Sequence, residues 1–352
     1  MKLRWWILIL FLLGIGGVSY VFLSFPHRPY GGQAIIEVKK GMGIASVVRE
    51  LEKAGLTDSP KKMDFYLRYK DVAANLKAGE YQFGPNATPA QIAEKLMKGE
   101  RYRRTFTIPE GYSVRDIAKL LAGKGIVDAD AFVKKALSID AATKMGLEGT
   151  TLEGYLFPDT YEYAKETTQD QILNMMVKNF KKHFDTQMME EAQKLGMTKN
   201  QVVTLASIIE KETGKEDERP IISGVFQNRL KIGMPLATDP SVIYGIPNFD
   251  GNIRKADLER DTPYNTYLHP GLPPTPIANP GVKSLQAALH PALTEYLYFV
   301  SRNDGSHQFS KTLEEHEAAV RQYQLSKASS QPASQPASQP NTAATTQPSA
   351  HP

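Results

Sequence analysis

Two carboxylates close a short apolar run, and either of them could carry acid–base chemistry. The run "LASIIEKET" spans Leu205–Thr213 and includes Glu210 and Glu212. A carboxyl in the last turn of a half-buried helix loses water and faces the negative end of the helix dipole, and both effects raise its pKa. A general acid near neutral pH needs such a raised pKa. A glutamate that merely ends an amphipathic helix would give the same pattern, so the run alone leaves both interpretations open.

The helix that positions these carboxylates is predicted over residues 199–213. Thr198 and Gln201 form a capping box at its start, and Gly214 is a suitable residue to follow its end. Apolar residues at i, i+3, i+4 and i+7 define one buried stripe, which consists of Val202, Leu205, Ala206 and Ile209. At about 100° per residue, the two carboxylates fall on opposite flanks of this stripe, roughly 200° apart. They are therefore not a pair, and spacing does not choose between them.

Loop segments on both sides of this helix are rich in Pro, Gly, Asn and Tyr. Such segments form rigid turns that present polar and aromatic groups. Aromatic faces beside amide and hydroxyl donors suit a sugar polymer. The segments are "LEGYLFPDTY" (152–161), "RLKIGMPLATDPSVIYG" (229–245), "TPYNTYLHPGLPPTPIANPG" (262–281), "YLYFVSRNDGSHQF" (296–309) and "EEHEAAV" (314–320).

The N-terminal segment predicts a membrane anchor. Residues 5–25 carry no charge and are about as long as a membrane-spanning helix. A cleaved signal peptide would have a shorter apolar region and a small-residue cleavage site, which this segment lacks. Lys2 and Arg4 precede the segment, which favours a cytoplasmic N-terminus over residues 1–4. We expect a single-pass protein of the inner (cell) membrane, with nearly all of the chain on the periplasmic or extracytoplasmic side.

Composition and charge exclude several classes of protein. The 352 residues, of which 41% are hydrophobic, suffice for two or three domains with cores. The 42 basic and 38 acidic residues give a formal charge of +4, which is too even to indicate a nucleic-acid partner. The absence of cysteine excludes disulfides, thiol catalysis and thiolate metal sites. Residues 328–352 repeat Gln, Pro, Ala and Ser, and we expect a disordered tail without activity there.

An internal repeat lies within residues 34–145. Two segments align at a constant offset, with Gly41 matching Gly111 and Gly55 matching Gly125. Each copy has an extended apolar segment, a glycine turn and apolar residues at helical spacing. Small strand–helix units of this kind resemble LysM carbohydrate-binding modules, which recognise N-acetylglucosamine chains. A small α+β spacer without a ligand would have the same pattern, so the repeat leaves glycan binding open.

In combination, these motifs resemble the endolytic murein transglycosylase family, the membrane-anchored YceG-like proteins. The resemblance runs from the N-terminal segment to about Tyr323 and leaves out the tail. It implies an α+β fold with one N-terminal transmembrane helix, a small LysM-like α+β domain, and a mixed α/β catalytic domain over residues 151–326. It also implies a lyase that acts on peptidoglycan.

The resemblance assigns functional residues as well. The glutamate of "ASIIE" is the family's catalytic acid, and the matching residue here is Glu210. Ser207 lies one turn earlier and could hydrogen-bond that carboxylate. Ala237 and Ser241 stand where the family often has Gln and Thr, which affects fine substrate contacts rather than the reaction. The implied substrate-binding cleft is lined by matches at Asp239, Tyr244, Tyr264, Asn265, Thr266 and His307.

The implied reaction uses one carboxyl group twice. Ordinary glycosidases need two carboxyl groups, whereas the helix presents one, and Glu153 and Asp159 cannot be placed from sequence. In the implied mechanism, Glu210 protonates the oxygen that links N-acetylmuramic acid to N-acetylglucosamine. It then takes the proton of the muramic acid C6 hydroxyl. The strand is cut without water, within nascent glycan, and keeps an anhydro-muramic acid end.

A second interpretation is a non-catalytic LysM-type scaffold that holds glycan near the wall-synthesis machinery. Peptidoglycan is the expected partner in both interpretations, and wall synthases such as penicillin-binding proteins are candidate protein partners. No cofactor, metal or nucleic acid is expected. Asp239, His307 and His316 lack the i, i+4 spacing of a metal-binding helix. We expect His269, His290 and His316 to be surface or structural residues.

Overall fold

The structure, a computed structural model, describes residues 23–325 and divides into two compact units. The first unit extends to Thr186 and includes Ala278–Gly281, and the second contains the rest of the chain from Gln187. The sheets of the described residues are three two-stranded antiparallel pairs. The α+β class is thereby confirmed. Residues 151–326, the predicted catalytic part, combine helices with strands as expected, and the strand pairs to which they contribute are antiparallel.

The predicted anchor and tail fall almost entirely outside the described residues, which begin at Leu23. Among residues 23–325, no helix is long and apolar enough to cross a membrane. The boundary between the compact units at Thr186 differs from the predicted limits of 34–145 and 151–326. Those limits stay a prediction about functional regions.

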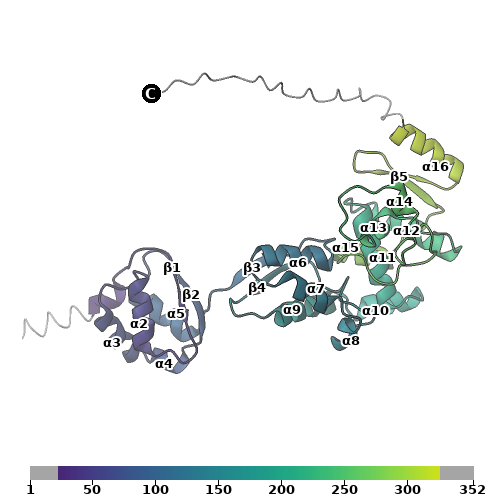
Figure 1. Ribbon diagram of the computed structural model, residues 1–352. Helices are drawn as coiled ribbons and strands as arrows, with labels where there is room; N and C mark the ends of the chain where they lie inside the picture. Colours follow the sequence, from purple (N-terminus) through teal and green to yellow (C-terminus); the bar gives the residue numbers. More distant parts are fainter. Residues whose placement is uncertain (1–22, 326–352) are drawn as a thin grey trace, which may run out of the picture. The chain divides into compact units, whose positions relative to one another are not determined.

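The first copy of the repeat forms the predicted strand, turn and helix. β1 (Ala34–Val38) pairs with β2 (Gly79–Phe83), and α2 (Ile44–Lys53) follows β1. Gly41 in the turn has a φ of +80°, a left-handed conformation that glycine adopts without strain. Helices and the strand pair enclose one apolar core (Figure 1). The other helical elements of this lobe are η1 (Phe25–His27), α3 (Pro60–Tyr69), α4 (Val72–Asn75) and α5 (Pro89–Lys98).

The second copy repeats the same local structure. β3 (Arg104–Thr107) leads through Gly111, with a φ of +74°, into α6 (Val114–Gly123). The strand pairs with β4 (Thr160–Tyr163), which comes from later in the chain. The shared left-handed glycines confirm that the sequence repeat is a structural repeat. This part also contains α7 (Ala129–Ala136), α8 (Ala141–Lys144) and α9 (Gln169–His183).

The central helix of the second unit is α11 (Lys199–Glu212), which carries both candidate carboxylates. It contacts α12 (Arg219–Lys231), α13 (Asp239–Tyr244) and α15 (Val282–Leu289). Because these helices surround it, every residue in 202–209 is buried, so the predicted single stripe was too narrow.

The ends of α11 agree only in part with the prediction. The capping box of Thr198 and Gln201 is formed. At the other end the chain leaves the helix through Thr213 in an extended conformation, with φ −144° and ψ 139°. Gly214 therefore does not end the helix in a left-handed conformation, and that prediction was wrong. The extended Thr213 directs the chain straight into the loop that precedes α12.

A hairpin and a helix complete the second unit. β5 (Tyr298–Ser301) pairs with β6 (His307–Ser310), and α16 (Leu313–Val320) packs on both strands (Figure 1). The remaining elements are α10 (Thr186–Lys194), α14 (Lys255–Leu258) and the short π-helix η2 (Arg321–Leu325).

Candidate active site

A cavity of about 670 Å³ lies at the C-terminal end of α11. Glu212, the last residue of that helix, lines it, whereas Glu210 is not among its lining residues. The β5–β6 hairpin, α16 and the segment 234–239, which ends at the first residue of α13, supply most of the other walls. The ionisable and phenolic side chains around the cavity are those of Glu212, Arg229, Asp239, Tyr267, Tyr298, His307 and His316.

The environment of Glu212 favours its protonated form. Burial raises the pKa of this carboxyl to about 8, and the negative charge of Asp239 acts in the same direction. The positive charge of Arg229 opposes the shift without cancelling it. At neutral pH the carboxyl is therefore mostly protonated and can donate a proton, as a general acid must. The sequence predicted such a pKa for a carboxyl on this turn, and the structure places it on Glu212.

Asp239, a predicted substrate-binding residue, shares this cavity with Glu212. Its Oδ1 accepts a hydrogen bond of 2.8 Å from the Tyr267 hydroxyl. Burial and this bond to Asp239 both raise the pKa of Tyr267, so that the phenol stays a donor. The cavity thus contains two carboxyl groups, and the argument from a single carboxyl needs correction at this point. Sequence spacing on one helix could not reveal a carboxyl that arrives from α13.

Arg229 fixes one wall of the cavity through backbone carbonyls. Its Nε donates to Leu297 O at 2.6 Å, and its Nη1 donates to Leu236 O at 2.6 Å. The guanidinium also lies 5.4 Å from the centre of the Tyr298 ring. The Arg229 guanidinium is thus held by backbone carbonyls, and from there its positive charge lowers the pKa of Glu212.

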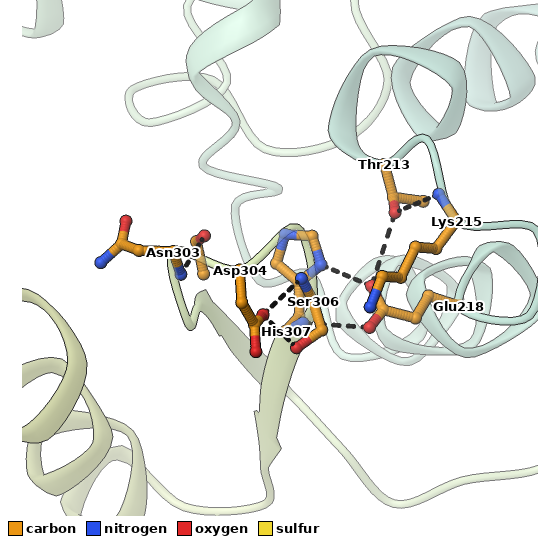
Figure 2. A network of polar contacts seen from close by, with 8 residues as sticks. Thr213, Lys215, Glu218, Asn303, Asp304, Ser306 and His307 are labelled. Carbon is orange, nitrogen blue, oxygen red and sulfur yellow. Dashed lines mark hydrogen bonds and ion pairs between the residues drawn. The ribbon is translucent and has the colours of Figure 1, made fainter.

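His307, also a predicted substrate-binding residue, lines the cavity and is held by Glu218 (Figure 2). The His307 Nδ1 lies 2.6 Å from Glu218 Oε2, and the His307 amide donates to Glu218 Oε1 at 3.0 Å. Thr213, next to Glu212, donates to the same carboxylate at 3.4 Å. One buried carboxylate therefore ties the end of α11 to the β5–β6 hairpin, and it fixes the ring nitrogen of His307 that faces it.

Glu210 occupies a different environment. Its Oε1 lies 3.2 Å from Nη2 of Arg219, the first residue of α12. Both side chains are more than nine-tenths buried, at 6% and 7% exposure. Removal of one partner from such a pair leaves a buried charge without compensation, which is strongly destabilising. The geometry therefore favours a structural role for Glu210 and a chemical role for Glu212.

Ser207 makes its hydrogen bonds within the fold. Its side chain is fully buried, its hydroxyl donates to Thr204 O at 2.7 Å, and it accepts from the Ile277 amide at 3.0 Å. These bonds join α11 to the segment 262–281. A role of Ser207 in substrate binding, suggested by its position one turn before Glu210, stays a prediction.

Two predicted substrate-binding residues, Asn265 and Thr266, make hydrogen bonds that hold the loop segment 262–281 in place. Asn265 is fully buried, and its Nδ2 donates to Leu258 O and Arg260 O. Thr266 is 2% exposed, and its hydroxyl oxygen accepts a hydrogen bond from the Thr238 amide. Both side chains are buried and bonded within the protein, and their predicted contact with substrate stays a prediction.

Two further predicted residues, Tyr244 and Tyr264, form a T-shaped pair with ring centres 4.9 Å apart. Tyr264 also shares a hydrogen bond with Thr275 at 2.9 Å. Neither is among the lining residues of the cavity. Their predicted contact with glycan stays a prediction.

The carboxylates that could not be placed from sequence lie in the first unit. Glu153 is fully buried and accepts from the Val114 amide at the start of α6 and from Asn279 Nδ2. Asp159 accepts from Asn179 Nδ2 at 2.8 Å. Glu153 is thus a buried helix cap. Its burial excludes it as the second carboxyl of a glycosidase.

Sequence reasoning missed Arg229, Tyr267 and His316 as residues of the cavity. His316 stacks on Tyr298 with ring centres 5.2 Å apart, and its buried Nδ1 has no hydrogen-bond partner among the described residues. The stacking on Tyr298 fits the structural role expected for His316, and its position at the cavity is an addition to that expectation. The only signal in the sequence was that these residues fall in or beside the Tyr-rich loop segments. Asp239, His307 and His316 all line the cavity, yet within residues 23–325 no three His, Asp or Glu side chains could hold a metal ion.

Comparison with known proteins places the chain in a family. The YceG-like family matches residues 36–322, a range that includes most of the described residues of both units and every lining residue of the cavity except Gln324. This chain belongs to the YceG-like family. A YceG-like protein of Listeria monocytogenes with a known crystal structure is 33% identical, with a TM-score of 0.58. The match covers 81% of this chain and 98% of the Listeria chain.

Two curated YceG-like relatives carry a name that states an activity. The endolytic murein transglycosylase of Bacillus subtilis is 34% identical over 308 residues, which cover 83% of this chain and 85% of that protein. The endolytic murein transglycosylase of Streptococcus pneumoniae serotype 2 is 30% identical over 328 residues. That match covers 83% of this chain but 58% of the longer pneumococcal protein.

Proposed function

We propose that this protein is an endolytic murein transglycosylase whose general acid is Glu212. The observation that carries the assignment of the acid is the Glu212 carboxyl at the cavity wall, with its pKa raised to about 8. The activity itself rests on the family and on the names of the relatives from Bacillus and Streptococcus. The scaffold interpretation is disfavoured, because a chain that only binds glycan has no need of a protonated carboxyl in a cavity.

The reaction follows from one carboxyl that changes its protonation state. Protonated Glu212 gives its proton to the glycosidic oxygen as the bond from C1 of N-acetylmuramic acid to that oxygen breaks. The substrate's acetamido group shields the electron-poor C1. The Glu212 carboxylate then takes the proton of the C6 hydroxyl while O6 bonds to C1. The ring closes to an anhydro end, Glu212 is protonated again, and no water is consumed.

The other groups of the cavity have supporting roles in this proposal. Asp239 raises the pKa of Glu212, and the Tyr267 hydroxyl fixes Asp239 at 2.8 Å. His307, oriented by Glu218, and His316 offer ring nitrogens to the polar groups of a sugar. Glu210, which the family resemblance suggested as the acid, stabilises the α11–α12 junction through Arg219.

We further propose the setting in which this enzyme acts. The uncharged segment 5–25 anchors it in the cell membrane with the N-terminus in the cytoplasm, so that the cavity meets nascent glycan outside. The LysM-like repeat within 34–145 holds the glycan, and the catalytic region comprises 151–326. Wall synthases are suitable partners because they release new strands at the same surface. Binding of the anchored chain to sacculi with and without residues 34–145 tests the role assigned to the repeat.

Product analysis tests the reaction type. Purified sacculi are digested with the protein, and the released fragments are separated by mass and by their response to borohydride. We expect ends that borohydride does not reduce and that are lighter by one water than muramidase products. Reducible, hydrated ends as the main product would make the enzyme a hydrolase with Asp239 as its second carboxyl.

A further inference from the structure

Helix α3 (Pro60–Tyr69) exposes aromatic side chains on its outer face. Phe65 is 52% exposed and Tyr69 is 75% exposed. Met63 and Leu67, on the inner face, have no exposed surface and belong to the core of the first lobe. At about 100° per residue, Phe65 lies roughly opposite the midpoint of these two core residues. Two aromatic side chains therefore point outward from a helix whose apolar inner face is already packed.

Basic residues surround these aromatics. Lys61, Lys62 and Arg68 are exposed and fall within roughly 60° of Phe65 around the helix axis. Residues 60–70 contain four Lys or Arg and one carboxylate, that of Asp64, which pairs with Arg68 at 2.7 Å. A helix face with aromatics at its centre and cations around them is typical of helices that lie at an anionic membrane surface.

The last residue of the uncharged segment packs against this helix. Phe25, which ends the uncharged segment 5–25, is buried against Tyr66 of α3, with ring centres 6.0 Å apart in a T-shaped contact. Tyr66 lies on the flank of α3, between its core face and its outer face. The last residue of the uncharged segment thus contacts the helix that carries the aromatic and basic face, and η1, which begins with Phe25, also contacts α5.

We propose that the outer face of α3, defined by Lys61, Lys62, Phe65, Arg68 and Tyr69, docks on the anionic lipid surface of the membrane that holds the anchor. The inference rests on the anchoring proposed above. Phe65 and Tyr69 enter the headgroup region, and the cations meet lipid phosphates, each of them adding to binding. A lobe docked by this face cannot swing freely about its anchor.

Site-specific labels can test this docking because the natural chain has no cysteine. Phe65→Cys and Tyr69→Cys are introduced singly into the full chain, labelled with an environment-sensitive dye and reconstituted in vesicles. The vesicles contain phosphatidylcholine with phosphatidylglycerol, or phosphatidylcholine alone, with nitroxide lipids as quenchers. Lys124→Cys, at an exposed position after α6, is the matched control. Ile15→Cys reports whether the apolar segment enters the bilayer.

We expect quenching at positions 65 and 69 in anionic vesicles, weaker quenching in high salt and in phosphatidylcholine alone, and none at position 124. The double change Lys61→Glu/Lys62→Glu should reduce quenching at position 69 by about tenfold or more, since each cation contributes to surface binding. The same charge change at Lys119 and Lys124 should leave it unaltered.

Quenching at position 15 without quenching at 65 and 69 would overturn the docking face while the anchor stands. The docking face would also be overturned if quenching at positions 65 and 69 were the same in anionic and in pure phosphatidylcholine vesicles. Equal quenching at position 124 would overturn it as well. Absence of quenching at position 15 as well would remove the anchor and the docking together. Release of fragments from sacculi by the labelled proteins reports the proposed activity separately.

Discussion

Arg219 Nη2 and Glu210 Oε1 lie 3.2 Å apart, with both side chains more than nine-tenths buried. This pair joins the last turn of α11 to the first residue of α12. Glu212, two residues later, has its own environment in the cavity, and its pKa is raised to about 8. Neighbouring carboxylates of one helix turn thus lie in different environments, and the proposed function gives the first a task in stability and the second a task in chemistry.

The first prediction separates the two glutamates. Glu212→Gln should lower turnover on sacculi by at least about a hundredfold with little change in melting temperature, because the proton donor is lost. Glu210→Gln should keep turnover per folded molecule but lower the free energy of unfolding by roughly 3–5 kcal/mol, because it leaves Arg219 buried without its partner. Fragment release and thermal unfolding measure the two effects. An inactive Glu210→Gln protein with normal melting would return the catalytic role to Glu210.

The second prediction concerns pH. A general acid works only while protonated, so kcat/KM should fall as pH rises through the Glu212 pKa of about 8. The negative charge of Asp239 raises that pKa, so Asp239→Asn should lower it and move the basic limb of the profile to lower pH. Rates on sacculi across pH measure the limb. A limb that does not move would contradict the coupling, and loss of activity at every pH would point to Asp239 as a reacting group.

The third prediction addresses the Glu218–His307 contact. Glu218→Gln should lower kcat/KM by roughly ten- to a hundredfold, because a hydrogen bond to a charged group contributes roughly 1.5–3 kcal/mol. The loss should appear mainly in KM, since His307 is assigned to substrate contact. Glu216→Gln is the matched control, because that exposed carboxylate pairs with Lys283 on the surface. Equal losses in both variants would show that the Glu218 carboxylate has no special role.

The fourth prediction tests the packing of α12. A Cβ on Gly224 would lie 2.6 Å from the Ala292 carbonyl oxygen and 2.8 Å from Thr294 Cγ2. Gly224→Ala should therefore destabilise the fold by roughly 1–3 kcal/mol. Gly123, at the end of α6, has open space around its Cβ position, and Gly123→Ala should stabilise by up to about 1 kcal/mol. Chemical denaturation measures both, and similar effects would refute the close contact at Gly224.

The sequence by itself determined the local structure of this protein. Capping boxes, left-handed glycines and apolar spacing act over a few residues, so the start of α11 and both copies of the repeat were predictable. Sequence also showed that the two glutamates could not face one substrate together, because helix geometry separates them by roughly 200°. The transglycosylase activity class followed from the resemblance of the combined sequence motifs to those of the family.

Only the tertiary structure decided which carboxyl can act. Glu210 and Glu212 have the same side chain and the same turn, and they differ in what reaches them from α12 and α13. Arg219 reaches Glu210, while Asp239 and the cavity surround Glu212. A pKa depends on burial and on charges brought together from distant parts of the chain, and spacing along one helix carries no record of them.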